Sequence, residues 1–163
     1  MAAAPPTSHP QPTHTRTQIC SLKALDALGS VRLSLVISDM PCLQDLTGLG
    51  GVSSVGLDLA LMGNGALRSV AGLEGLKSIG HDLIVTRNGG LLNVDALKGL
   101  EEVGADGGGS ILIFDNGSLG SVAGLSGGAL KPFLGGASLA RNGGALPAAQ
   151  AQALAAKAVR QLA

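Results

Sequence analysis

The sequence has 163 residues and a formal net charge of zero, with 11 basic and 11 acidic side chains. The balanced charge excludes an electrostatic surface for nucleic acid, and no run of about 20 apolar residues is present to span a membrane. Only Phe114 and Phe133 are aromatic, because the chain has no Trp or Tyr, so a core built around large rings is also excluded.

The first 18 residues predict a disordered tail, because Pro, Thr and His dominate and apolar side chains are few. They also lack the apolar segment of a secretory signal. We therefore expect a chain that is not exported by the usual route or one that has lost its leader, and a cytoplasmic location stays open.

A 24-residue repeat follows the tail and occupies residues 19–146. Residues 56–79 align without a gap with residues 80–103, so that Leu59 meets Leu83 and Asn64 meets Asn88. The pattern resumes at Ile111 after four extra residues, 105–108. Each copy begins with the Leu-x-Leu alternation of a half-buried strand and continues with an Asn-Gly turn signal.

A unit of this length cannot bury its own apolar face, so successive copies are expected to stack as rungs about 4.8 Å apart. The predicted fold is mainly β, a parallel solenoid of about five rungs. Two columns of equivalent residues define its interior. The first column is aliphatic and consists of Leu35, Leu59, Leu83 and Ile111. The second consists of small residues at a place where two sides of the coil come close, namely Ala27, Gly48, Gly72, Ala96 and Gly124.

Residues 147–163 predict a helix that covers the open end of the last rung. Pro147 suits a helix start and the segment is rich in Ala, a strong helix former. We expect Leu154, Val159 and Leu162 to face the rung.

The run from Asn64 to Val85, NGALRSVAGLEGLKSIGHDLIV, resembles the signature of the receptor L domain, Asn-x-x-Leu-x-x-Leu-x-Gly-Leu-x-x-Leu-x-x-Ile-Gly-x-x-Leu-x-Ile. This family occurs in insulin-receptor-like and epidermal-growth-factor-receptor-like ectodomains and in fungal cell-wall proteins. The resemblance covers roughly residues 22–146. It implies a right-handed β-helix, an extracellular or cell-surface location and ligands that dock on the solenoid face. The competing pattern is the ordinary leucine-rich repeat, from which the chain departs in the spacings of Ile79 to Leu83 and Asn88 to Leu91.

Three polar columns cross the rungs. Asn64, Asn88, Asn116 and Asn142 predict a structural ladder of turn asparagines, which leaves the sequon at Asn116 without a glycan if that side chain points inward. Asp58 and Asp82 predict a solvated ridge rather than a catalytic pair. Gly63, Arg87, Asp115 and Arg141 predict weak ion pairs between neighbouring strands.

Cys20 and Cys42 fall near corresponding positions of the first two copies, and two alternatives stay open, a disulfide clip or two free thiols. No Cys/His cluster has the spacing of a metal site, and the acids do not converge on a base. We therefore expect no metal, no cofactor and no enzymatic activity.

Strand alternation sends two columns of side chains outward and makes an apolar exposed sheet, which is typical of a binding surface. The columns are Val36, Ala60, Ile84 and Leu112, then Ser38, Met62, Thr86 and Phe114. The alternative is that this face packs against the chain's own tail or a larger assembly.

The functional hypothesis is a non-catalytic module that binds a protein or glycan ligand through one face, made of Met62, Ile84, Thr86, Arg87, Leu112 and Phe114. Two alternatives remain: a structural cell-wall or matrix repeat without a specific ligand, and an intracellular leucine-rich-repeat interaction protein.

Overall fold

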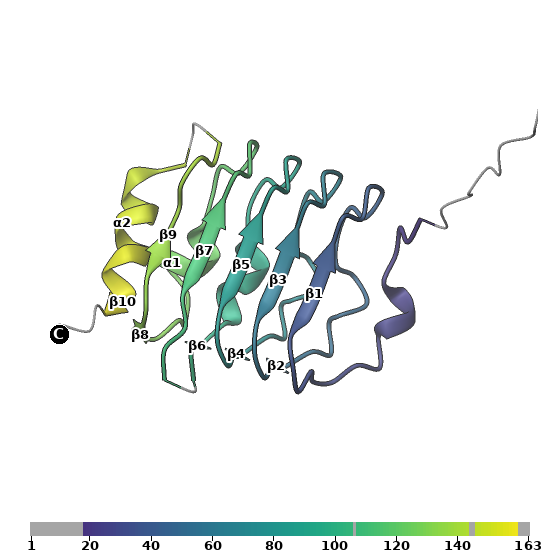
Figure 1. Ribbon diagram of the computed structural model, residues 1–163, viewed down its shortest axis with the longest axis horizontal. Helices are drawn as coiled ribbons and strands as arrows, with labels where there is room; N and C mark the ends of the chain where they lie inside the picture. Colours follow the sequence, from purple (N-terminus) through teal and green to yellow (C-terminus); the bar gives the residue numbers. More distant parts are fainter. Residues whose placement is uncertain (1–17, 106, 144–145, 160–163) are drawn as a thin grey trace, which may run out of the picture.

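The chain forms a β-solenoid with a helix across its C-terminal end (Figure 1). This is a computed structural model, and it describes residues 18–105, 107–143 and 146–159. The tail predicted to be disordered lies, except for Gln18, outside the described residues.

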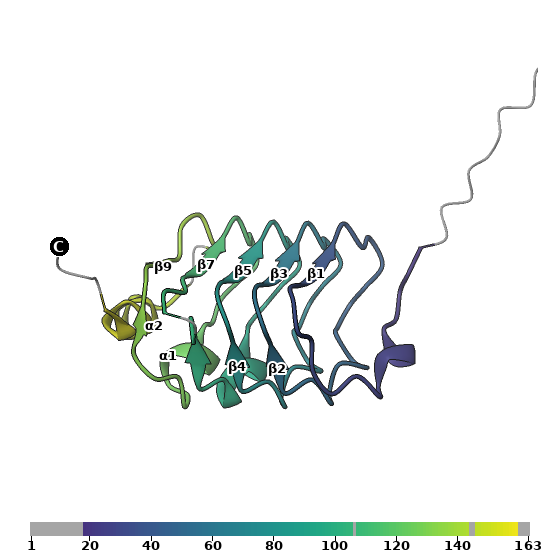
Figure 2. The same cartoon turned by 60° about the horizontal axis from the view of Figure 1, so that its bottom comes forward.

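Two parallel sheets lie on opposite sides of the coil (Figure 2). The main sheet takes one strand from each coil, in the order β1 (Leu35–Ser38), β3 (Leu59–Met62), β5 (Leu83–Thr86), β7 (Ile111–Phe114) and β9 (Ala137–Ser138). The second sheet is made of β2 (Ser54–Val55), β4 (Ser78–Ile79) and β6 (Glu102–Val103). The other elements are η1 (Lys23–Leu25), η2 (Asp95–Gly99), α1 (Ala123–Ser126), β8 (Phe133–Leu134), α2 (Ala148–Lys157) and β10 (Ala158–Val159). The chain thus makes about four turns between β1 and β9.

The strand register follows the sequence repeat. Leu59 pairs with Leu83, which is the predicted offset of 24, and Leu83 pairs with Ile111 across the four-residue insertion. The insertion is therefore accommodated between the strands without slipping the ladder, and the same side chains stay on the core side of the sheet.

The predicted aliphatic column is buried. Leu59, Leu83 and Ile111 have no exposed surface, and each contributes about 1.5–3 kcal/mol by leaving water. Leu35 is only partly buried because it belongs to β1, the edge strand of the sheet, which pairs with a neighbouring strand on one side only among the described residues.

The small-residue column is confirmed at Gly48, Gly72 and Gly124, where a Cβ would clash with the coil before, whereas Ala27, also predicted to belong to it, is exposed. A Cβ on Gly72 would lie 2.1 Å from the carbonyl oxygen of Leu46, and one on Gly48 would lie 2.1 Å from that of Leu22. Both glycines have positive φ, +106° and +113°. A side chain here would force the coils apart, so stacking requires glycine at these two positions.

The C-terminal cap is shorter than the helix predicted over residues 147–163. The helix α2 ends at Lys157, and β10 then pairs in parallel with β8, because the edge of β8 offers a partner to the extended chain. Leu154 is fully buried against the last coil as expected, whereas Leu162 lies outside the described residues.

Polar side chains of the cap replace the bonds of a missing coil. The side-chain oxygen Oε1 of Gln150 accepts a hydrogen bond from the Val122 N–H at 2.8 Å, and Lys157 Nζ donates to the Leu130 carbonyl at 2.6 Å. The cap therefore provides partners for these two backbone groups of the last coil.

Candidate functional site

The asparagine column forms a continuous hydrogen-bonded ladder at the corner that follows the main sheet. The Asn64 N–H donates to Asn88 Oδ1, and the Asn88 N–H donates to Asn116 Oδ1, both at 3.0 Å. Each amide group also bonds the coil before it, as Asn88 Nδ2 does to the Leu61 carbonyl at 2.9 Å. Asn64, Asn88 and Asn116 have no exposed surface, so this column holds coils together and is closed to ligands.

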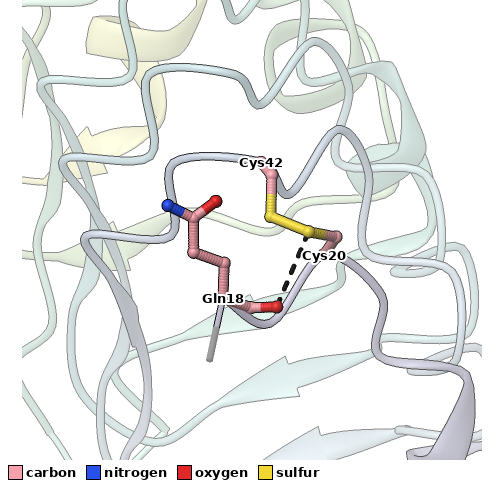
Figure 3. The surroundings of a disulfide bond; sticks show 3 residues. All are labelled: Gln18, Cys20 and Cys42. Atoms are coloured by element: carbon pink, nitrogen blue, oxygen red, sulfur yellow. Dashed lines mark hydrogen bonds between the residues drawn. A yellow bond between two sulfur atoms is a disulfide. The ribbon is translucent and has the colours of Figure 1, made fainter. Parts of the chain in front are cut away.

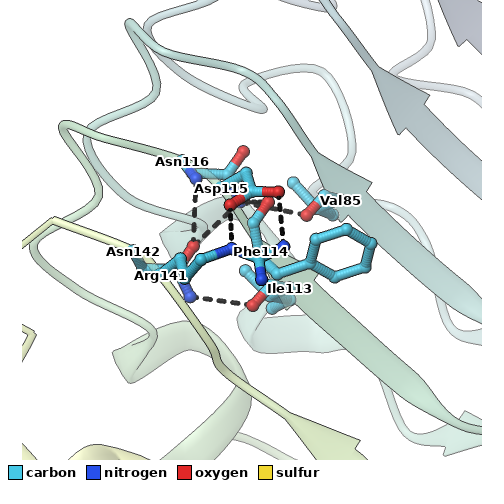
Figure 4. Close-up of polar contacts among 7 residues, drawn as sticks. All are labelled: Val85, Ile113, Phe114, Asp115, Asn116, Arg141 and Asn142. Atoms are coloured by element: carbon cyan, nitrogen blue, oxygen red, sulfur yellow. Dashed lines mark hydrogen bonds and ion pairs between the residues drawn. The ribbon is translucent and has the colours of Figure 1, made fainter.

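The ladder has a defined end on each side. At the N-terminal side Met40 takes the place of an asparagine, and its N–H donates to Asn64 Oδ1 at 3.0 Å. At the other side Asn142 is only partly buried, and its Oδ1 accepts from the Asn116 N–H at 3.2 Å (Figure 4). Because Asn116 is buried and its Nδ2 donates to the Val85 carbonyl, the folded chain does not present the sequon to a glycosylating enzyme.

Asp58 and Asp82 form a second ladder, which corrects the prediction of a solvated ridge. Both are partly buried, and the Asp82 N–H donates to Asp58 Oδ1 at 3.1 Å. Ser110 continues the column by donating its N–H to Asp82 Oδ1 at 2.7 Å, and Ser34 begins it with its hydroxyl 3.3 Å from Asp58 Oδ2. The carboxylates are acceptors for the N–H groups that precede each strand, so they are engaged in structure.

The outward face of the main sheet is less exposed than strand alternation predicted. Met62, Ile84, Leu112 and Phe114 are partly exposed, and they form a strip across β3, β5 and β7. Ala60 and Thr86, which were expected to be exposed, are each only 4% exposed. Their short side chains lie between longer ones on the neighbouring strands, about 4.8 Å away on each side.

Thr86 is at the centre of this strip, with Met62 and Phe114 as its register partners. Among the described residues its Oγ1 is the buried side-chain polar atom without a hydrogen-bond partner. An unpaired buried hydroxyl carries a desolvation cost of about 1–3 kcal/mol.

A charged rim borders the strip where the strands end. Arg87 is exposed, and Arg141 binds Asp115 with two hydrogen bonds, of which the one from Nη2 to Oδ2 measures 2.9 Å (Figure 4). The bonds from Arg141 lower the pKa of the Asp115 carboxyl. Of the ion pairs predicted in this column, the one between Asp115 and Arg141 is present, whereas Arg87 forms none with the described residues.

The rim residues share an uncommon backbone conformation. Asp39, Arg87, Asp115 and Arg141 have φ between +52° and +59°, and Gly63 occupies the same place in the second coil with φ +68°. Four non-glycine residues thus turn the chain out of the sheet in the left-handed region.

The cysteines form a disulfide, so the alternative of two free thiols is set aside. Cys20 and Cys42 have Cα atoms 4.9 Å apart, and the bond ties the N-terminal segment to the turn after β1 (Figure 3). A groove of about 660 Å³ lies beside it, between that segment and the first two turns of the sheet. It is lined by Gln18, Ile19, Ser38, Asp39, Met40, Pro41, Gly63, Gly65 and Ala66.

Within residues 18–105, 107–143 and 146–159, no three His, Cys, Asp or Glu side chains gather in a way that could hold a metal ion. No helix in the same part of the chain has the length and apolar character needed to cross a membrane. Comparisons of the chain with known protein families, with curated proteins and with solved structures found no match.

Two features of the site were missed by sequence reasoning. The Ser34, Asp58, Asp82 and Ser110 column repeats at the strand entrances, and its side chains can accept backbone hydrogen bonds, which was the available signal for a ladder. The groove beside Cys20 had no such signal, because its walls come from the N-terminal segment and from two separate turns.

Proposed function

We propose that the chain is a non-catalytic binding module whose ligand, a protein or a glycan, covers the strip of Met62, Ile84, Leu112 and Phe114. The observation that carries this proposal is the continuity of the strip. Its members are partly exposed on three adjacent strands: Ile84 pairs with Leu112, and Met62 and Phe114 lie on either side of Thr86, so one ligand surface would desolvate them together.

The shape of the strip favours a macromolecule over a small molecule. Small ligands are bound in concave pockets, whereas this strip is the open side of a sheet and spans three strands, or about 10 Å. The charged side chains of the rim would orient a bound ligand, because Arg87 is exposed and Arg141 is held in place by Asp115. An extended partner with an acidic group beside an apolar segment suits this combination.

The unpaired hydroxyl of Thr86 supports the same location. It lies between its register partners Met62 and Phe114, so a ligand that shifts these two side chains as it binds would reach it. A ligand with a polar group here would recover a hydrogen bond and gain specificity, because a ligand without one would leave the hydroxyl unpaired.

The use of the acids supports the non-catalytic part of the proposal. The carboxylates of Asp58 and Asp82 accept hydrogen bonds from backbone N–H groups of the next coil, so both side chains are engaged in holding coils together. We therefore assign these two acids to the scaffold.

We further propose an extracellular or cell-surface location. The disulfide of Cys20 and Cys42 is the supporting observation, because such bonds persist in oxidising compartments and are rare in the cytosol. The resemblance to receptor L domains, whose members dock ligands on the solenoid face, points to the same setting.

The test of the binding face compares two substitutions of exposed apolar side chains. Phe114→Ser removes the largest member of the strip, and Leu92→Ser is the matched control, because Leu92 is 49% exposed and follows the asparagine turn outside the main sheet. Binding to a partner isolated from the native source is expected to weaken by about tenfold or more for Phe114→Ser and to stay unchanged for Leu92→Ser. If Phe114→Ser binds like the wild type, the strip is not the binding surface.

A further inference from the structure

The groove beside the disulfide lies where the second coil lacks a side chain that the other coils have. Gly63 follows β3, whereas the equivalent places after the other strands of the main sheet hold Asp39, Arg87, Asp115 and Arg141. The backbone does not require glycine here, because these four residues adopt φ between +52° and +59° and Gly63 has φ +68°. The missing side chain leaves a hollow at the end of β3.

The carboxylate of Asp39 lies against this hollow. A Cβ on Gly63 would be 2.5 Å from Asp39 Oδ1, so the absence of a side chain on Gly63 gives the carboxylate its place. Among the described residues that line the groove, Asp39 alone is charged, and it forms no ion pair with the part of the chain that the structure describes. A groove of about 660 Å³ thus contains one negative charge.

Two more polar side chains line the groove. Gln18 belongs to the N-terminal segment and lies beside the disulfide (Figure 3), and Ser38 ends β1. Neither of these side chains, nor that of Asp39, is hydrogen-bonded to another described residue. The amide oxygen of Gln18, the hydroxyl of Ser38 and the carboxylate of Asp39 are therefore three acceptors at one groove.

The backbone around the groove favours a cation over an anion. Four of the lining residues already donate their N–H groups to oxygen atoms of the fold, namely Asp39, Met40, Gly63 and Gly65. An anion would find these donors engaged and a carboxylate beside it. A cation would find an opposite charge and two further acceptors.

Apolar side chains complete the walls of the groove. They are Ile19, Met40, Pro41 and Ala66, and Ile19 is 49% exposed. Walls of this kind suit a long side chain with a charged end, because its aliphatic stem is buried along apolar surface while its head reaches polar partners.

We propose that the groove binds a lysine side chain of a partner protein. The ammonium group has three N–H donors, which match the three acceptors of Gln18, Ser38 and Asp39. The four-carbon stem then lies along Ile19 and Met40. The site is separate from the strip that contains Phe114, and it does not depend on a ligand there.

The disulfide makes the site complete. Cys20 directly follows the wall residues Gln18 and Ile19, and its bond to Cys42 ties that wall to the turn after β1. Lysine binding at this groove therefore requires the oxidised protein, since the reduced protein has no covalent bond between the two walls.

The test is a titration of the full-length, isotope-labelled protein with Nα-acetyl-lysine N-methylamide, followed by nuclear magnetic resonance. The amide signals of Gly63 and Gly65 are expected to shift until the site is saturated. Those of Gly89 and Gly117 are the internal control, because they occupy the place of Gly65 in later coils and do not line the groove. The norleucine analogue has the same stem without the ammonium group, and it is expected to bind at least about tenfold more weakly.

Two substitutions remove the site in different ways. Asp39→Asn keeps the shape of the side chain and suits the φ of +54°, and it is expected to weaken binding at least about tenfold. Asp95→Asn is the matched control, because Asp95 is an exposed carboxylate on η2 outside the groove. Gly63→Arg gives the second coil the residue that Arg87 supplies in the next coil, so it is expected to fill the hollow and abolish binding.

Reduction of the disulfide is expected to weaken lysine binding at least about tenfold, with far-ultraviolet circular dichroism as the check that the protein stays folded. The proposal is overturned if Asp39→Asn or the reduced protein binds lysine like the wild type, or if the norleucine analogue binds as tightly as lysine. Tighter binding by Arg16→Gln would mean that an arginine of this chain occupies the groove, and it would overturn the assignment to a partner. Binding at the strip is measured separately with Phe114→Ser, so the two proposals can fail independently.

Discussion

Replacing Asn88 with Ala removes one step of the asparagine ladder and is the sharpest test of how the coils are held together. The side chain is fully buried and bonds two neighbouring coil segments. Its Oδ1 accepts from the Asn64 N–H at 3.0 Å, and its Nδ2 donates to the Leu61 carbonyl at 2.9 Å. Alanine can do neither.

The expected loss in the free energy of unfolding is about 2–4 kcal/mol. The N–H of Asn64 would be buried without a partner, which costs about 1–3 kcal/mol, and the lost bond to Leu61 adds about 0.5–1.5 kcal/mol. Domains of this size are stable by about 5–15 kcal/mol, so a large part of the total is at stake. Water cannot take over, because the site has no exposed surface.

Asn142→Ala is the matched control. Its Oδ1 accepts from Asn116 and its Nδ2 donates to the Ile113 carbonyl, which is the same pattern, but the side chain is partly exposed at the end of the ladder. Water can replace those bonds, so we expect a loss of about 1 kcal/mol or less. Urea unfolding followed by far-ultraviolet circular dichroism measures both, since the chain has no Trp or Tyr to report by fluorescence. Equal losses for the two variants would refute the argument from burial.

Three further predictions concern stability. Thr86→Val should raise the free energy of unfolding by about 1 kcal/mol, because it replaces a buried unpaired hydroxyl with a methyl group of similar shape; a lower urea midpoint would show that the hydroxyl is satisfied. Cys42→Ser removes the disulfide to Cys20, which joins residues 22 positions apart in the sequence. The free energy of unfolding should fall by about 3 kcal/mol, and reduction of the disulfide in the wild type must cause the same loss. Leu154→Ala should cost about 2–5 kcal/mol and speed amide exchange first in the coil beneath α2; uniform exchange across the solenoid would contradict a role in capping.

The sequence was sufficient to predict the inside of the solenoid because the inside is periodic. Equivalent side chains meet on adjacent coils, so an offset of 24 residues specifies which strands pair, and Leu59 and Leu83 are placed by arithmetic. The requirement for glycine at Gly48 and Gly72 follows from the same stacking, because each of these coils closely approaches the one before it at that point.

The outside could not be predicted to the same degree, because exposure depends on the sizes of neighbouring side chains as well as on strand alternation. Thr86 points outward but is buried between Met62 and Phe114. The alternation of inward and outward residues along a strand does not predict this burial. Asp58 was predicted to be solvated because it is charged. Its carboxylate instead accepts a hydrogen bond from the N–H of Asp82 on the next coil, a contact that the charge alone does not predict. The helix α2 ends early because the chain after it pairs with the edge of β8. No sequence pattern near residue 158 predicts that pairing.

Specificity in such a fold lies where the repeat is broken. The ladder asparagines are the same on three successive coils because each supports the next, and a change there costs stability. The outward positions carry no such obligation: position 38 is Ser where position 114 is Phe, and position 63 is Gly where position 87 is Arg. Since the backbone at these positions is equivalent, the differences between coils are not explained by folding. They place the large outward side chains of Met62, Ile84, Leu112 and Phe114 on β3, β5 and β7, which is why the binding strip is assigned to the middle of the sheet.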